Sequence, residues 1–152
     1  MTFSRLAPRV ALPVLFVAGL GALSAAVVSG SSAERHKTLR ITKECSQYTG
    51  AAGSFCTITS SNVAAIKIGS KVFYDQAAGV PAGLLDSNVV LDAGHSNRAL
   101  GRCTLDGTTN IGLCTFSDGT GRLAGFHARI DVDCTDGCRW DGTYGFKPES
   151  DR

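Results

Sequence analysis

The residues from Ser117 to Asp133 read SDGTGRLAGFHARIDVD, a glycine-rich turn followed by a run of alternating character. Apolar side chains stand at every second position of this run, and polar or charged side chains stand between them. The apolar positions are Phe126, Ala128, Ile130 and Val132, and the polar ones are His127, Arg129, Asp131 and Asp133. A period of two is typical of a strand with one buried face. The stretch therefore predicts a tight turn that opens a long, half-buried strand.

The neighbouring segments repeat this pattern, separated by turns rich in Gly, Asn and Asp. Arg98 to Asp106 alternates, residues 107–110 form a hairpin loop, and the chain returns from Ile111 to Phe116. Further strands are expected at 56–59, 69–75, 84–91 and 140–146. Residues 34–44 predict a flexible lead-in or a first short strand, and residues 63–68 a helical turn or an extended link. About eight short strands without a long helix predict an all-β fold, an antiparallel barrel or sandwich.

Residues 1–33 have the features of a secretory signal peptide. Arg5 and Arg9 precede an apolar run from Val10 to Val28, and small residues follow this run. Cleavage after Ala26 or after Ala33 fits the small-residue pattern. The apolar run is also nearly long enough to cross a bilayer, so an uncleaved membrane anchor is the alternative. We expect residues 34–152 to form one secreted or extracytoplasmic domain.

All six cysteines follow residue 33, and an even number in an exported chain predicts disulfide bonds. A symmetric hairpin would place Cys103 opposite Cys114, at a separation that suits a disulfide. The other pairings stay open: a Cys45–Cys56 bridge would pin a glycine-rich loop, and a Cys134–Cys138 bridge would close a tight turn. Zinc sites usually need two clusters of closely spaced ligands, and only the last pair has that spacing. We therefore expect disulfides and no metal.

The charge balance and the motifs exclude several classes of function. Without residues 1–33 the chain has 13 basic and 13 acidic residues, so it lacks the basic excess of a nucleic-acid-binding protein. The glycines from Gly119 to Gly125 are close to a dinucleotide-binding pattern, but a strand follows them where that pattern needs a helix. No cofactor is expected. There is no G-x-S-x-G motif, and His36, His95 and His127 lie in a lead-in, a turn and a polar strand face.

The segment from Asp118 to Phe126 resembles the Gly-Thr-Gly turn of allene oxide cyclases and their relatives, the dirigent proteins. A second match is the stretch from Ile68 to Asp75, which is similar to a dirigent segment of glycine, apolar strand and aspartate. The resemblance extends over about Gly69 to Phe146. It implies an eight-stranded antiparallel β-barrel with an apolar cavity, in a family that steers ring closure or radical coupling. Asp75 alone matches an acidic position of that pattern, and the cyclase's assisting carboxylate has no counterpart here.

We therefore expect a disulfide-stapled β-barrel domain over residues 34–152 that binds a small apolar molecule in its lumen and steers an isomerisation or cyclisation. Tyr74 and Asp75 are the candidate binding residues, and the small residues Ala128 and Gly142 would leave room for the ligand. The alternative is a non-enzymatic secreted or surface interaction protein with a filled barrel. Its mark would be a lumen packed by Phe126, Ile130, Trp140 and Phe146. The sequence decides neither the ligand, nor the oligomeric state, nor whether the protein is an enzyme.

Overall fold

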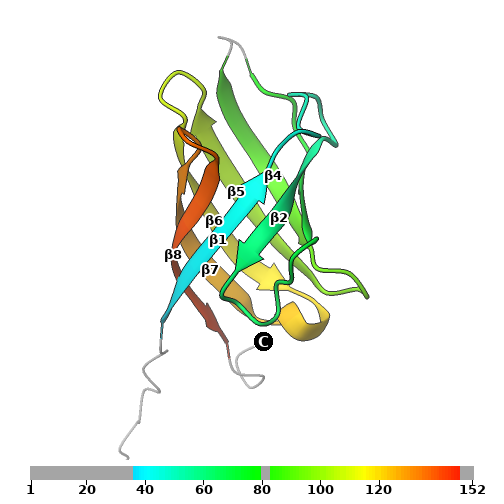
Figure 1. Ribbon diagram of the computed structural model, residues 1–152. Helices are drawn as coiled ribbons and strands as arrows, with labels where there is room; N and C mark the ends of the chain where they lie inside the picture. Colours follow the sequence, from blue (N-terminus) through cyan, green and yellow to red (C-terminus); the bar gives the residue numbers. More distant parts are fainter. Residues whose placement is uncertain (1–35, 80–82, 148–152) are drawn as a thin grey trace, which may run out of the picture. The chain divides into compact units, whose positions relative to one another are not determined.

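The structure is a computed structural model that describes residues 36–79 and 83–147 of the 152-residue chain. These residues form eight antiparallel strands that close into a barrel (Figure 1). The strands are β1 (Lys37–Glu44), β2 (Phe55–Ser61), β3 (Lys71–Tyr74), β4 (Leu84–Asp92), β5 (Arg98–Asp106), β6 (Ile111–Gly119), β7 (Phe126–Asp133) and β8 (Cys138–Phe146). The predictions of an all-β fold and an eight-stranded antiparallel barrel are confirmed. The expected signal peptide, residues 1–33, lies outside the described residues.

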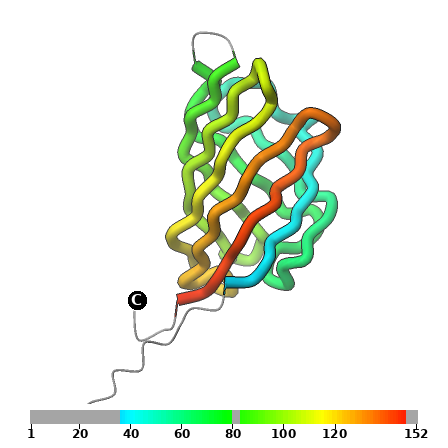
Figure 2. The backbone as a smooth tube through the Cα atoms, turned by 90° about the vertical axis from the view of Figure 1, so that its left-hand side faces the viewer, coloured from blue at the N-terminus to red at the C-terminus, as the bar shows by residue number. Residues whose placement is uncertain are grey.

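Each strand pairs with the next along the chain, and β8 returns to pair with β1 (Figure 2). The closing ladder runs from Lys37 opposite Tyr144 to Lys43 opposite Cys138. A closed sheet leaves no unpaired edge strand that could pair with another chain. Residues 34–44, which the sequence left open between lead-in and strand, thus contain the strand that completes the barrel.

The turns gather at two opposite ends of the barrel (Figure 1). At one end, which we call the cavity end, lie the loops 45–54, 107–110 and 134–137, together with residues 75–79 and Gly83 of the connection between β3 and β4. At the other, the packed end, lie the loops 62–70, 93–97 and 120–125. The first residue of β1 and the last of β8 are both at the packed end, where the amide of Lys147 donates a hydrogen bond to the carbonyl of Gly125.

Large side chains fill the lumen from the packed end to the floor of the cavity. The rings of Phe126, Phe116 and Trp140 are fully or almost fully buried, and the centroid of Phe116 lies 6.0 Å from Phe126 and 5.8 Å from Trp140, which is opposite Val132 in the ladder. The apolar positions of the 117–133 stretch point inward as predicted, and Ile130 is 1% exposed. Phe146 differs, because it is 40% exposed at the end of β8.

The glycine-rich turn before β7 is more structured than the sequence indicated. β6 continues through Gly119, and Gly121–Leu123 forms one turn of 3-10 helix that carries the fully buried Leu123. Gly121 has a φ of 58°, and a β-carbon there would meet the side-chain oxygen of Asn97. Only glycine fits this position without strain, because other residues rarely adopt a positive φ and would also collide. The stretch from Gly119 therefore closes the packed end of the barrel.

Several expectations need correction. Residues 63–68 form turns without a regular helix, although Val63 and Ile66 are buried in the core. The expected strand 69–75 is shorter, at Lys71–Tyr74, and the strand expected at 56–59 is longer, at Phe55–Ser61. Gly142 does not leave room in the lumen. A β-carbon at this position would collide with the backbone oxygen of Arg129, so the space is taken by the neighbouring strand.

We predict that Gly142→Val destabilises the barrel by about 2–3 kcal/mol, because the added atoms meet backbone that cannot rotate away. Urea unfolding followed by circular dichroism measures this change. The matched control is Thr143→Val at the exposed neighbouring position, where we expect a change of less than about 0.5 kcal/mol. Equal stability of the two variants would show that β7 and β8 tolerate a wider spacing.

Candidate functional site

A cavity of about 600 Å³ occupies the lumen at the cavity end of the barrel. Its volume is within the range of small-molecule sites in proteins, about 300–1,000 Å³. Apolar side chains such as Leu85, Leu105 and Val132 contribute to its wall, together with backbone from the turns around Gly83 and Gly107. The lumen is thus divided: large aromatic side chains fill the packed end, and a hollow remains at the other.

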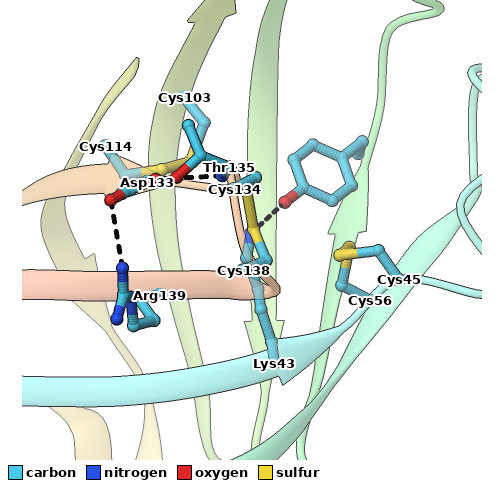
Figure 3. The surroundings of a disulfide bond; sticks show 11 residues. Lys43, Cys45, Cys56, Cys103, Cys114, Asp133, Cys134, Thr135, Cys138 and Arg139 are labelled. Carbon is cyan, nitrogen blue, oxygen red and sulfur yellow. Dashed lines mark hydrogen bonds and ion pairs between the residues drawn. A yellow bond between two sulfur atoms is a disulfide. The ribbon is translucent and has the colours of Figure 1, made fainter. Parts of the chain in front are cut away.

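Three disulfides surround this cavity, and all six half-cystines line it (Figure 3). Cys45–Cys56 joins the chain after β1 to β2, Cys103–Cys114 crosses between β5 and β6, and Cys134–Cys138 closes the turn between β7 and β8. The favoured Cys103–Cys114 pairing is confirmed, with the two residues directly opposite in the ladder, and the structure decides the two pairings that the sequence left open. Three disulfides indicate an oxidising environment. They also restrict the motion of the strands around the cavity.

Lys43 is the cationic residue that the fold turns into this lumen. It follows the buried Leu39 and Ile41 at every second position of β1, so it shares their inward face. The pairing of β1 with β2 shifts register between Thr42 and Lys43, and such irregularities re-aim side chains near functional sites. The residue is 5% exposed and lines the cavity.

The partners of the Lys43 amine are all uncharged. Its Nζ donates a hydrogen bond of 2.6 Å to the Oη of Tyr74, and it lies 4.3 Å from the ring centroid of Trp140. No carboxylate forms an ion pair with it in the part of the chain that the structure describes. The neighbouring Glu44 is exposed, also lines the cavity, and accepts a hydrogen bond from the Ser46 amide. Burial without a counter-charge is expensive for an ammonium group.

Burial therefore lowers the pKa of Lys43 to about 7. The faces of the Trp140 and Tyr74 rings attract a cation and favour the charged form, but this attraction is smaller than the cost of removing the ammonium from water. Burial also raises the pKa of Tyr74, and that of Tyr48 beside it. Near neutral pH the site thus holds an amine in both protonation states next to a protonated phenol.

Tyr48 adds a second hydroxyl to the cavity wall. Its ring centroid lies 5.0 Å from that of Tyr74, and its buried hydroxyl has no hydrogen-bond partner among the described residues. An unpaired buried hydroxyl is unfavourable, and a ligand group that bonds to it would remove this cost. Lys43, Tyr48 and Tyr74 therefore form a polar cluster in a mostly apolar wall, which also includes Glu44, Thr104 and Asn110.

The structure separates the two predicted binding residues. Tyr74 is 3% exposed and lines the cavity. Asp75, the next residue, is exposed and lies beside a shallow groove on the outside of the barrel, with Asn88 and Arg102. Adjacent residues of a strand face opposite sides of a sheet, so Tyr74 and Asp75 do not meet in one site. The role of each in binding stays a prediction.

Lys43 itself was missed by the sequence analysis, which treated residues 34–44 as polar. The signal was present, because Leu39 and Ile41 place Lys43 on the apolar side of an alternating strand. On β7, Asp133 accepts a hydrogen bond from Thr135 and forms an ion pair with Arg139 on the surface, and Asp131 is exposed. Among residues 36–79 and 83–147, no three His, Cys, Asp or Glu side chains gather where they could hold a metal ion.

Comparisons with protein-family models, with curated proteins and with solved structures find no match for this chain. The resemblance to allene oxide cyclases and dirigent proteins therefore stays a prediction. Within the described residues there is no helix with the length and hydrophobicity needed to cross a bilayer. The candidate site is thus defined by its geometry alone.

The protonation of Lys43 predicts how stability changes with pH. Its pKa in the folded protein, about 7, is below that of an unfolded lysine, so between these values the unfolded chain binds more protons. The stability of the native protein should then rise with pH relative to Lys43→Met, which lacks the amine. We expect the difference in unfolding free energy to move by roughly 2 kcal/mol in favour of the native protein between about pH 7 and about pH 9.

Urea unfolding of both proteins at several pH values measures this difference. The comparison ends at about pH 9 so that the tyrosines stay protonated. Below about pH 7 the lysine is charged in both states, and the difference should become constant. A difference that is constant across the whole range would show that the buried amine keeps its charge.

Proposed function

We propose that this is an exported protein that binds a small apolar molecule in the cavity at one end of its barrel. The observation that carries the proposal is the hollow of about 600 Å³ beside a lumen that is elsewhere filled with side chains. Small closed barrels either fill with side chains or hold one ligand. In this barrel, side chains fill one end of the lumen, and the other end is hollow. Export is supported by the three disulfides and by the signal-like character of residues 1–33.

The wall of the cavity indicates the kind of ligand. Its apolar surface would take up a hydrocarbon or aromatic body, and the cluster of Lys43, Tyr48 and Tyr74 would bind one polar group and fix the orientation. The disulfides hold the surrounding strands in place, which lowers the entropic cost of binding. If the protein is an enzyme, we propose that it steers an isomerisation or cyclisation of the bound molecule. Such a reaction would require a ligand that is held in one orientation.

The rival function, an interaction protein with a filled barrel, has partial support. Phe126, Ile130 and Trp140 pack the lumen as that hypothesis required, but Phe146 is partly exposed and does not complete the packing. The filled region is also limited to the packed end. A molecule in the lumen would therefore be confined to the cavity end, so the two hypotheses differ in whether that end takes up a ligand.

Binding of the fluorescent probe N-phenyl-1-naphthylamine tests the proposal. The probe should brighten with the native protein, and Val132→Trp should weaken its binding by about tenfold or more, because the indole fills a cavity whose wall includes Val132. The matched control is Asp131→Trp, which places the same side chain on the exposed face of β7. Equal binding by all three proteins would place the probe elsewhere, and no binding by the native protein would favour the filled-barrel alternative.

A further inference from the structure

Lys43 is the only amine among the described residues that line the cavity. If Lys43 only filled space next to Trp140, an apolar side chain could replace it without loss of stability. If Lys43 only contributed to the stability of the fold, we would expect its buried charge to have an acidic partner. The described part of the chain supplies no ion-pair partner for it. The position combines a buried amine, an adjacent phenol and an empty volume in contact with the same side chain.

We propose that Lys43 forms a Schiff base with the aldehyde or ketone group of an apolar ligand held in the cavity. This inference rests on the proposed function and deepens it by naming the chemical class of the ligand. The lining supplies what such a ligand needs: an apolar surface for its body and one nucleophilic nitrogen for its carbonyl carbon. Desolvation of the amine maintains a share of the neutral, nucleophilic form near neutral pH.

The chemistry balances without any further reactant. The lone pair of the neutral Nζ attacks the carbonyl carbon, the C=O electrons move to the oxygen, and a proton passes from nitrogen to that oxygen to give a carbinolamine. The C–O bond then breaks, the hydroxyl leaves as water with one proton, and the nitrogen lone pair forms the C=N bond. The nitrogen releases its last proton as the imine forms. No electron is gained or lost overall, and one water molecule is the only by-product.

Tyr74 is placed to assist the loss of water. Its hydroxyl is 2.6 Å from Nζ, and because burial keeps it protonated, it can donate a proton to the departing oxygen. The proton released from nitrogen then restores the phenol. The apolar wall also limits access of water, which would otherwise hydrolyse the imine.

Reductive trapping tests the inference. The native protein is incubated near pH 7 with trans-cinnamaldehyde and sodium cyanoborohydride, which reduces an imine to a stable secondary amine. Each trapped site gains the mass of the aldehyde less one oxygen atom, and peptide mass spectrometry locates it. Lysines in water are almost entirely protonated at this pH, so Lys43 should be labelled at least about tenfold faster than the exposed Lys67. Equal or slower labelling of Lys43 would overturn the inference.

Two variants refine the result. Lys43→Met should fold and lose the fast labelling phase, because it keeps the length of the side chain without the amine. Tyr74→Phe should slow the labelling of Lys43 by about tenfold or more, because it lacks the proton donor. Fast labelling that persists in Lys43→Met would assign it to another amine and overturn the inference. Circular dichroism confirms that both variants fold.

A competition experiment separates this inference from the proposed function. Cinnamyl alcohol has the same body as the aldehyde but cannot form an imine, and it should displace the fluorescent probe from the cavity. Displacement by the alcohol without labelling of Lys43 by the aldehyde would retain the binding function and reject the Schiff base. Failure of the probe, the alcohol and the aldehyde alike to bind would reject both.

Discussion

The pairing of β1 with β8 is the constraint on which the rest of the structure depends. It closes the sheet, and closure converts one face of every strand into a single enclosed lumen. A short barrel lumen has room for only a few large side chains, so the residues that face inward decide whether it is solid or hollow. Because Lys43 is on the closing strand, the pairing that completes the barrel also carries the amine into its interior.

One end of the lumen is filled and the other is hollow because the inward-facing side chains differ in size. Towards the packed end, Phe126 and Leu123 are fully buried, and the ring of Phe116 lies between those of Phe126 and Trp140, which is fully buried below the cavity. At the cavity end, half-cystines occupy several inward positions, and each is tied to a partner on the barrel wall. A side chain held to the wall by a covalent bond cannot fold inward to fill the centre. The disulfides therefore stabilise the cavity end and also help to keep it open.

Much of the fold could be predicted from the sequence because its determinants are local. The alternation in 117–133 indicated the inward face of β7, and the symmetric loop between Asp106 and Ile111 set the register that places Cys103 opposite Cys114. The position of Gly142 was misinterpreted, because a missing side chain can mean either free space or close backbone approach. Only the distance between strands decides between these, and that distance is a property of the whole barrel.

The candidate site was less accessible to prediction than the fold. Tyr74 lies in a stretch identified by resemblance. The alternation of β1 indicated that Lys43, 31 residues earlier, is on the inward face, but its contact with Tyr74 could be recognised only once β1 and β3 were known to face the same lumen. A lysine in a polar segment normally indicates a solvated surface. Its meaning here comes from its burial without an ion-pair partner among the described residues, and the neighbours of a side chain in a barrel are contributed by several strands at once.

The first residue of β1 and the last residue of β8 lie together at the packed end, and this has a consequence for how the barrel can be held. The cavity is at the opposite end of the lumen. A barrel held on a bead or a surface through its packed end would therefore turn its cavity towards the solution.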